Sequence, residues 1–287
     1  MPKVLVVGDV IDDILVSPKG EIRIDTDTPA SIVASPGGSG ANFACWLASL
    51  GLEVNFVGRV GKNDLERQEQ ILKSYGVKPY LQTDEELQTG RIVILIDGQA
   101  RSFLTDRGAN VALDLKAIQD DLFGEALYIS GYSVFDQDSE DVKALIARAR
   151  AKGIVICDPG SAGYIADHSV HGFLNAVDGV DVLVPSLEEG RILTSEDRPD
   201  VIAGQLSQRF SLVALTLGKE GVQLAWGDQS LKVDAFDAET VDATGAGDAF
   251  AAKFLAELLR LSEPQDAAVE ANRFAAKAVT KMGGRPQ

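Results

Sequence analysis

Short apolar runs alternate with segments in which apolar residues recur at helical spacing along most of the chain. The run 3–8 is almost continuously apolar, which is typical of a strand buried on both faces of a parallel sheet. Similar runs follow at 126–130, 154–158, 180–184 and 213–217. Strands that alternate with helices in this way predict an α/β fold with a doubly wound, mostly parallel sheet flanked by helices.

Two segments, 14–35 and 88–105, alternate polar and apolar residues and have no helical period. This alternation is typical of half-exposed strands. The expected strands are 21–25, 31–35, 90–96 and 100–104. Asp97-Gly98-Gln99 between the last two predicts a hairpin turn. We therefore expect a single domain over 1–287 with β-rich insertions at about 14–35 and 88–105.

Helical spacing and end signals predict the main helices. Gly51 ends the first, Asp138 caps one in the middle of the chain, and Pro264 starts the last. Their expected ranges include 41–50, 63–74, 249–260 and 264–282. A hairpin over Gly227-Asp228 joins two further strands, 221–226 and 230–234.

Composition narrows the class of protein. Lys plus Arg number 27 against 43 Asp plus Glu, a net charge of −16. So acidic a surface repels phosphate backbones and anionic lipids, which excludes nucleic acid and membrane as partners. Cys45 and Cys157 lie in apolar settings and are expected to be buried thiols in a reducing compartment. The N-terminus runs directly into a strand with no signal peptide, so we expect a cytoplasmic protein.

The stretch 241–250 carries the clearest chemistry. Its small residues form a tight turn that leads at once into a helix, so a ligand can approach the backbone closely. The N–H groups and the positive dipole end of a helix N-terminus favour an anion. Asp248 in the first turn is expected to be charged, and so available as a proton acceptor at neutral pH. Alternatively, Asp248 only caps an ordinary connection.

The nine residues Asp-Ala-Thr-Gly-Ala-Gly-Asp-Ala-Phe, 242–250, resemble the C-terminal signature of the ribokinase-like (phosphofructokinase-B) family of ATP-dependent carbohydrate and nucleoside kinases. Further matches occur in the same order along almost the whole chain. The resemblance implies a ribokinase-like fold in which the two β-rich insertions form a lid over the sugar. It also implies that Asp248 is the catalytic base and that Gly245, Ala246 and Gly247 form the anion hole for the transferring phosphate.

The resemblance also implies the residues that bind the substrate. Asp13 matches an aspartate that binds sugar hydroxyls, and it is preferred to Asp12 because neighbours in an extended chain face opposite sides. Gly37, Gly38 and Asn42 match a Gly-Gly substrate motif. A dinucleotide fingerprint is disfavoured there because the third spaced glycine is missing.

Three residues near the expected pocket edge have alternative roles. Asn110, in a segment like the family's Gly-Ala-Asn element, either binds substrate or only caps the next helix. Arg107 could face a phosphate or another substrate charge. Tyr132, just past a strand end, is expected to pack on the substrate.

The nucleotide site follows from the same resemblance, and no Walker A pattern is present. Thr216, Gly218 and Gly221 match a Thr-x-Gly-x-x-Gly loop that lies along ATP. Asn272 matches a residue that lines the adenine pocket. Asp242 and Thr244 match a monovalent-cation loop of some members, which implies K⁺.

Ser186 and Glu189 resemble the family's Asn-x-x-Glu motif, with Ser186 in place of the Asn. The match implies that Ser186 lies at the nucleotide and that Glu189 helps to place Mg²⁺ through water. Ser-x-x-Glu before an apolar run is equally the pattern of a helix capping box.

These observations together predict an ATP- and Mg²⁺-dependent kinase that phosphorylates a hydroxyl of a small sugar, and a homodimer joined through the lid. The alternatives are a nucleoside or sugar-phosphate kinase of the same family, and a degenerate relative that senses sugar without catalysis. Intact Asp248 argues against the sensor, whereas Ser186 argues for it.

Overall fold

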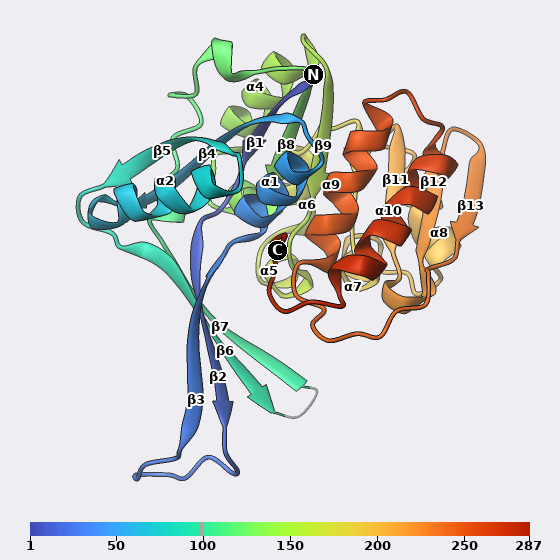
Figure 1. The fold of residues 1–287 in the computed structure, drawn as a ribbon. Coiled ribbons are helices and arrows are strands. Elements are labelled where there is room, and N and C mark those ends of the chain that lie inside the picture. The colour runs from blue at the N-terminus through green and yellow to red at the C-terminus, as the bar shows by residue number, and fades with distance from the viewer. Residues whose placement is uncertain (98–99) are drawn as a thin grey trace.

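The computed structural model describes residues 1–97 and 100–287. Its main sheet has nine strands in the order β13-β12-β11-β10-β9-β8-β1-β4-β5 (Figure 1). The strands are β1 Lys3–Val7, β4 Glu53–Gly61, β5 Lys78–Asp84, β8 Ala126–Ser130, β9 Ile154–Asp158, β10 Val182–Leu183, β11 Leu212–Thr216, β12 Val222–Trp226 and β13 Gln229–Val233. All pairs are parallel except β11–β12 and β12–β13. The prediction of a doubly wound, mostly parallel sheet is confirmed.

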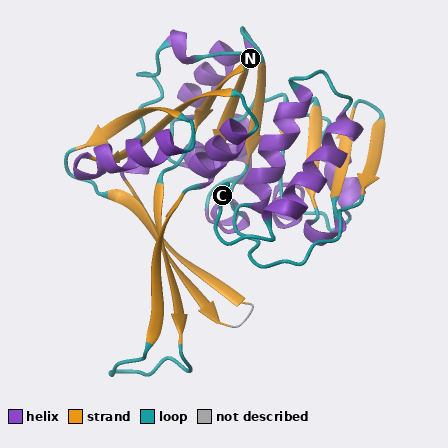
Figure 2. Ribbon diagram, viewed as in Figure 1, coloured by secondary structure: helices purple, strands orange, loops and turns teal. Residues whose placement is uncertain are grey.

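Helices cover both faces of this sheet (Figure 2). One face packs against α1 Ser39–Ser49, α2 Leu65–Ser74, α9 Ala246–Leu258 and α10 Pro264–Ala278. The opposite face packs against α4 Ser139–Arg150, α5 Ala162–Asp167, α6 Val170–Ala176, α7 Leu187–Thr194 and α8 Pro199–Leu206. The shorter helices are η1 Lys62–Asp64, η2 Ala109–Ala112, η3 Asp120–Leu122, α3 Gly131–Phe135 and η4 Gly218–Glu220.

Successive residues of the central strand β1 pack alternately into the two hydrophobic cores, one on each face of the sheet. Val4 and Val6 of β1 belong to the core beneath α1 and α9, whereas Leu5 and Val7 belong to the core beneath α4. This explains why the run is apolar throughout, because both of its faces are removed from water. Full burial of each such side chain contributes about 1.5–3 kcal/mol.

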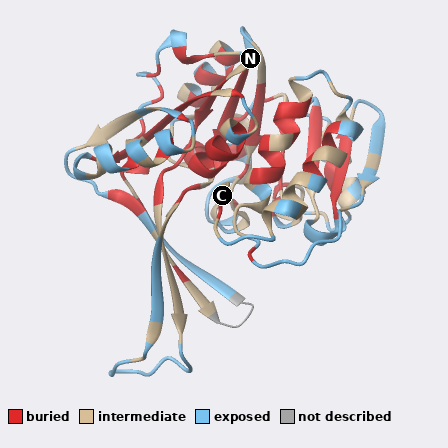
Figure 3. Ribbon diagram, in the orientation of Figure 1, coloured by how far each residue is buried: buried red, intermediate tan, exposed pale blue. Residues whose placement is uncertain are grey.

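A second sheet projects from the main body, with strand order β3-β2-β6-β7. Its strands are β2 Ile11–Pro18, β3 Ala30–Gly37, β6 Thr89–Asp97 and β7 Ala100–Gly108. Figure 3 shows that the sheet and inner helices of the main body are buried, whereas the far end of this small sheet is largely exposed. We call the small sheet the lid.

The structure differs from the sequence-based expectation in several elements. Segment 21–25 is not a strand, and its alternation is misleading because Ile22 and Ile24 are both exposed. The first lid strand is instead β2, which begins at Ile11. Helix α9 begins at Ala246, three residues before the expected start, and α10 ends at Ala278, before Met282. The expected turn at Gly98-Gln99 lies outside the described residues.

Other local predictions are confirmed. Asp138 caps α4 and accepts a hydrogen bond from Glu140 N, and the hairpin β12–β13 spans Gly227-Asp228. Cys45 and Cys157 are free and buried. Among the described residues, the helices are too short or too polar to cross a membrane.

Candidate active site

A cavity of about 720 Å³ opens at the carboxyl ends of the central parallel strands, between the main body and the lid. Parallel α/β sheets place ligands at this edge, where the strand order reverses. The reversal here is at β1, because the chain passes from β1 to β4 on one side and returns to β8 on the other. The cavity is lined by carboxyl, hydroxyl and aromatic side chains and by the backbone at 243–247.

Asp248 lies in the first turn of α9 and lines the cavity. Ser39 Oγ donates to its Oδ1 at 2.7 Å, and Asn42 Nδ2 donates to its Oδ2 at 3.3 Å. Both donors come from the first turn of α1, so the N-termini of two helices converge on one carboxylate. Their partial positive charge and these hydrogen bonds favour its ionised form.

Burial outweighs those interactions in this structure. It raises the pKa of Asp248 to about 7, against the lowering by the Ser39 and Asn42 hydrogen bonds. The sequence-based expectation that this carboxylate can accept a proton at neutral pH stays a prediction, and burial brings its pKa closer to neutrality than the helix dipole alone implies. The helix dipole could be read from the sequence, whereas the depth of burial could not. A pKa near 7 suits a group that must accept and release a proton at neutral pH.

The turn before α9 brings small residues and their backbone to the cavity. Gly245 is the N-cap at φ 72°, a left-handed conformation, and a Cβ there would lie 2.6 Å from Gly284 Cα. Gly247 has open space around its Cα, because a Cβ there would meet no atom within 4 Å. Gly245, Ala246 and Gly247 all line the cavity. The first-turn N–H groups of a helix have no intrahelical acceptor and can therefore bind an anion.

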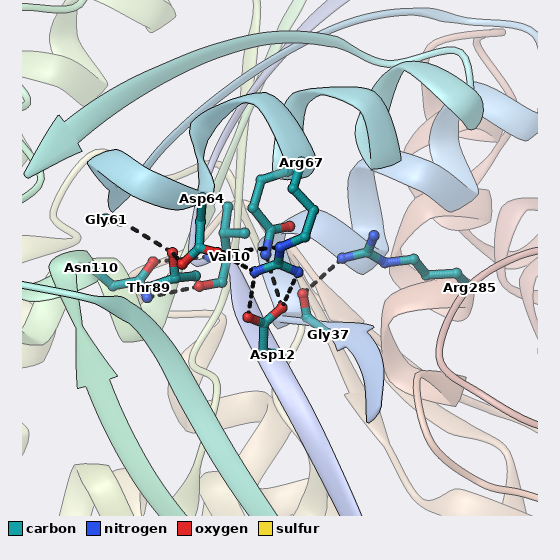
Figure 4. A network of polar contacts seen from close by, with 10 residues as sticks. Val10, Asp12, Gly37, Gly61, Asp64, Arg67, Thr89, Asn110 and Arg285 are labelled. Atoms are coloured by element: carbon teal, nitrogen blue, oxygen red, sulfur yellow. Dashed lines mark hydrogen bonds and ion pairs between the residues drawn. The ribbon is translucent and has the colours of Figure 1, made fainter. Parts of the chain in front are cut away.

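Asp12 and Asp13 face opposite sides of β2, as the alternation of a strand requires. Asp12 accepts from Arg67 at 2.9 and 2.6 Å and from Gln68 at 2.9 Å, outside the cavity (Figure 4). Asp13 lines the cavity. Burial, with the nearby charge of Asp9, raises the pKa of Asp13 to about 7.

The Gly37-Gly38 pair leaves space for this carboxylate. A Cβ at Gly37 would lie 2.2 Å from Asp13 Oδ2, and one at Gly38 would lie 2.5 Å from Asp9 O. Gly38 also has φ 92° and is the N-cap of α1. Gly38 and Asn42 line the cavity, whereas Gly37 does not.

Arg107 and Tyr132 line the cavity together with Tyr164. The Arg107 guanidinium pairs with Asp136 at 2.9 Å, donates to Tyr132 O at 2.8 Å, and lies 5.4 Å from the centre of the Tyr132 ring. The rings of Tyr132 and Tyr164 meet edge to face at 5.3 Å. Arg107 is thus neutralised and mainly holds this aromatic wall in place.

Asn110 and Asn272 do not line the cavity. Asn110 Oδ1 accepts from Val10 N at 2.9 Å, and its Nδ2 donates to Val10 O and Arg107 O, so it fastens the turn after β1 (Figure 4). It lies inside the short helix η2 and does not cap it. Asn272 Nδ2 donates to Val233 O and Asp234 O. Neither amide is presented to a ligand in the cavity.

Ser186 and Glu189 form the capping box of α7. Ser186 N donates to Glu189 Oε2 at 2.7 Å, and Glu189 N donates to Ser186 Oγ at 3.4 Å. Both residues also line the cavity, as does Asp158 at the end of β9. Burial raises the pKa of Glu189 and, more strongly, that of Asp158, which also feels the Glu189 charge.

These carboxylates suit an ion held largely through other ligands. The described residues contain no cluster of three or more Asp, Glu, His or Cys side chains that could form a complete metal cage. Mg²⁺ keeps several waters and commonly binds through one or two carboxylates plus substrate phosphates. The residues present therefore fit Mg²⁺ bound with a nucleotide through Asp158, Glu189 and water.

The side chains expected to bind a monovalent cation, Asp242 and Thr244, already bind other groups of the protein. Arg101, from lid strand β7, donates to Asp242 Oδ1 at 2.8 Å and to Thr244 Oγ1 at 2.5 Å. Thr244 N and Gly283 N also donate to Asp242 at 2.9 Å each, and such bonds hold the pKa of Asp242 low, at about 2. A guanidinium stands beside the oxygens that K⁺ would use, so these side chains do not fit K⁺ here.

The expected nucleotide loop lies at the end of β11. Thr216 lines the cavity and its N–H donates to Pro185 O at 2.8 Å, which brings the loop beside Ser186. Gly218 and Gly221 have positive φ, 59° and 98°, and do not line the cavity. A Cβ at Gly221 would lie 2.1 Å from Val233 O, so this glycine is required for the fold of the loop.

Sequence reasoning missed several residues at the site. Asp9 accepts from Ser39 N at 3.2 Å and Gly40 N at 3.1 Å, and so caps α1 across the cavity floor. Arg285, near the end of the chain, donates to Asn42 Oδ1 and Gly37 O. The sequence could have indicated Asp9, because this residue lies just after the first buried strand. The local sequence around Arg285 carries no comparable signal.

Comparisons with known proteins agree with this architecture. A model of the pfkB family of carbohydrate kinases matches residues 1–287. A fructokinase from Klebsiella pneumoniae is 30% identical over 285 residues, which covers 93% of this chain and 87% of the relative.

Two solved structures share the fold. An adenosine kinase from Sinorhizobium meliloti superposes with a TM-score of 0.88 at 24% identity and covers 99% of this chain and 96% of its own. A ribokinase from Thermotoga maritima gives a TM-score of 0.83 at 24% identity and covers 99% and 95%. These likenesses confirm the predicted ribokinase-like fold.

Proposed function

Because this chain belongs to the pfkB family of carbohydrate kinases and is an ATP-dependent kinase of that family, we propose that it phosphorylates a hydroxyl of a small, unphosphorylated sugar. The family match also confirms the resemblance drawn from 242–250. The observation that carries the choice of substrate is that six carboxyl groups line the cavity against two arginines, both of which are paired with aspartates.

The lining favours a neutral polyhydroxy compound. Its carboxyl groups are those of Asp9, Asp13, Asp158, Asp167, Glu189 and Asp248. Its arginines, Arg101 and Arg107, are each paired with an aspartate, Asp242 and Asp136. A sugar phosphate would find no unpaired guanidinium among the described lining residues, whereas sugar hydroxyls can form hydrogen bonds with carboxyl groups.

The arrangement around Asp248 supports a role as general base. Its carboxylate, with a pKa near 7, would accept the proton of the attacking hydroxyl while the first-turn N–H groups of α9 stabilise charge on the phosphoryl group. Asp13, Gly38 and Asn42 would hold the sugar, and Ser186 and Thr216 the nucleotide. Bound Mg²⁺ would neutralise phosphate charge, with Asp158 and Glu189 orienting its waters.

Lid closure would exclude water, whose attack would otherwise hydrolyse ATP. Ile92, Ile94 and Phe103 of the lid already line the cavity and present apolar surface to it.

A nucleoside is the second candidate substrate. The observation in its favour is that Tyr132, Tyr164 and Phe103 of the lid all line the cavity, since aromatic rings can stack on a base. An adenosine kinase also shares the fold. The same wall can pack against the apolar face of a sugar ring, so it does not outweigh the acidic lining.

The test is ATP consumption with Mg²⁺ across ketoses, aldoses, sugar acids, sugar phosphates and nucleosides. The proposal expects a neutral sugar to give the highest kcat/KM, with fructose as the first to try because a fructokinase is 30% identical. A preferred nucleoside or sugar phosphate would overturn the substrate class. Binding of a sugar, with no turnover of any compound in the panel, would support the non-catalytic sensor.

The outer face of the lid supports a homodimer. Register places Ile14, Val16, Ile32, Val93, Leu95 and Leu104 on the face opposite the cavity. Ile32 is 66% exposed and Leu104 59%. A continuous apolar sheet face of this kind is the usual mark of an interface, and a second lid presents the same surface. Sedimentation equilibrium should give a dimer that Ile32→Lys disrupts, and a wild-type monomer at micromolar concentration would contradict it.

A further inference from the structure

Arg285 lies behind the cavity, in a segment that three other contacts hold in place. Gly283 N donates to Asp242 at 2.9 Å, Trp46 Nε1 donates to Gly284 O at 2.8 Å, and Gly284 packs against Gly245. Arg285 is only 6% exposed. Its backbone position is thus fixed independently of its guanidinium.

The guanidinium joins two parts of the substrate side of the cavity. Nε donates to Asn42 Oδ1 at 2.9 Å. Nη2 donates to Gly37 O at 2.7 Å, at the end of lid strand β3 that adjoins the main body (Figure 4). An arginine can donate from several nitrogens in a rigid plane, so two contacts fix its orientation. The Gly37-Gly38 turn and α1 are thereby held in one relative position.

The contact with Asn42 also decides which way its amide faces. An amide has one accepting oxygen and one donating nitrogen. Because Arg285 has only donors, Oδ1 must face it, and Nδ2 then faces Asp248, to which it donates at 3.3 Å. If the amide were reversed, its Nδ2 would face the donors of Arg285, and its Oδ1 would face the accepting oxygens of Asp248.

Arg285 also counters an otherwise acidic environment. The charged and titratable groups around Asp248 are Asp9 after β1, Tyr128 on β8, Asp158 on β9 and Arg285. The charge of Arg285 lowers the pKa of both Asp248 and Asp13, against the raising effect of burial and of Asp9.

We propose that Arg285 is a positioning residue for phosphoryl transfer: it fixes the Asn42 amide against Asp248 and brings a positive charge behind both cavity carboxylates, Asp13 and Asp248. This inference rests on the proposed function, because it assumes that Asp248 is the base. It assigns to the last residues of the chain a part in the chemistry that neither the signature 242–250 nor the lid would suggest.

Two variants separate charge from geometry. Arg285→Lys keeps the charge but cannot donate to both oxygens from one rigid plane. Arg285→Gln removes the charge. Arg273→Gln is the matched control, since Arg273 pairs with Glu270 on the exposed side of α10. Each variant is assayed for kcat and KM from pH 5.5 to 9 with the best sugar, and for thermal unfolding from pH 5 to 8.

We expect Arg285→Gln to shift the acidic limb of the pH profile of kcat/KM to higher pH by about 0.5–1 unit. The same variant should lower kcat at pH 7 by about tenfold. Arg285→Lys should keep the limb in place but lower kcat several-fold. Arg273→Gln should change neither. An unmoved limb and wild-type kcat in Arg285→Gln would overturn the proposal. If that variant does not fold, wild-type kcat in Arg285→Lys would do so.

Thermal unfolding tests the charge without turnover. Both cavity carboxylates lose stabilisation as pH rises through their folded pKa values, because burial favours their protonated form. Between pH 5 and 8, the unfolding temperature of Arg285→Gln should therefore fall by about 2–3 °C more than that of Arg273→Gln. Equal losses would contradict the charge effect even if no substrate were known. Absence of wild-type turnover on any sugar would instead refute the proposed function.

Discussion

The hydroxyl of Ser39 donates to Asp248 at 2.7 Å and so joins the first turns of α1 and α9, 209 residues apart in the chain. This bond lowers the pKa of Asp248 against the larger raising effect of burial. The two helix N-termini thus hold the proposed base in a balance between protonated and ionised forms near pH 7.

Ser39→Ala removes that hydrogen bond and should raise the pKa of Asp248. Because the base acts only when ionised, the acidic limb of kcat should move upward by about 0.5–1 pH unit. The loss should be largest below pH 7 and small above pH 8. Ser49→Ala is the control, since Ser49 Oγ donates to Trp46 O at the other end of α1. A uniform loss at all pH values would argue against this link.

Gly247→Ala tests the anion cradle without harming the fold. A Cβ at Gly247 meets no atom within 4 Å, and alanine is favoured in a helix by about 0.5–1 kcal/mol. The variant should therefore unfold at a slightly higher temperature but lose at least about tenfold in kcat, because the methyl group occupies space needed by the phosphoryl group. Gly204→Ala in α8 is the control, because a Cβ there also meets no atom within 4 Å; this variant should gain stability with no change in kcat. Full activity in Gly247→Ala would exclude close approach of the phosphate there.

The fold could be predicted from the sequence because it rests on short, local patterns, and the candidate base because 242–250 resembles a family signature. Two-faced apolar strands give the parallel sheet, and the small residues at 243–247 precede a helix with Asp248 in its first turn. The preference for Asp13 over Asp12 needed the family position together with the alternation of a strand. The structure places Asp13 in the cavity lining, whereas Asp12 binds Arg67.

The rest depended on contacts across the chain. Arg101 meets Asp242 over 141 positions and Arg285 meets Asn42 over 243, and no local spacing predicts either. Asn110 and Asn272 matched family positions, yet each amide is used by nearby backbone. The raised pKa of Asp248 could not be predicted either, because burial is a property of the assembled site.

Asp13→Asn should make stability less dependent on pH. The folded pKa of Asp13, about 7, lies above its ordinary value of 3.8, so its stabilising effect is complete below pH 4 and is lost as pH rises through 7. The neutral amide avoids that loss. The variant should be more stable than wild type by about 1–3 kcal/mol at pH 8, with little difference at pH 4. Denaturant unfolding at both pH values measures this.

The KM of the same variant tests substrate contact. Loss of a carboxylate that accepts sugar hydroxyls should raise the KM for sugar by about tenfold or more, with the KM for ATP unchanged. Asp12→Asn is the control, because Asp12 binds Arg67 outside the cavity. An unchanged sugar KM in Asp13→Asn would remove Asp13 from the substrate site.

The Arg101 contacts predict that K⁺ is not required. Wild-type turnover in a buffer with only tetramethylammonium as the monovalent cation should equal that in 100 mM K⁺ within about twofold. Arg101→Ala frees the oxygens of Asp242 and Thr244 and should make turnover increase with K⁺. Arg91→Ala, on the neighbouring lid strand, is the control. Strong K⁺ activation of the wild type would show that Arg101 moves away in the working enzyme.

The most direct test of the account is kcat of Asp248→Asn with the best sugar and Mg²⁺-ATP, with binding of both ligands measured by calorimetry. The amide keeps the size of the side chain but cannot accept the proton. We predict kcat lower by about 10²–10⁴ with the dissociation constants for ATP and sugar within a few-fold of wild type. Turnover close to wild type in this variant, with the fold intact, would contradict the central claim that Asp248 is the base.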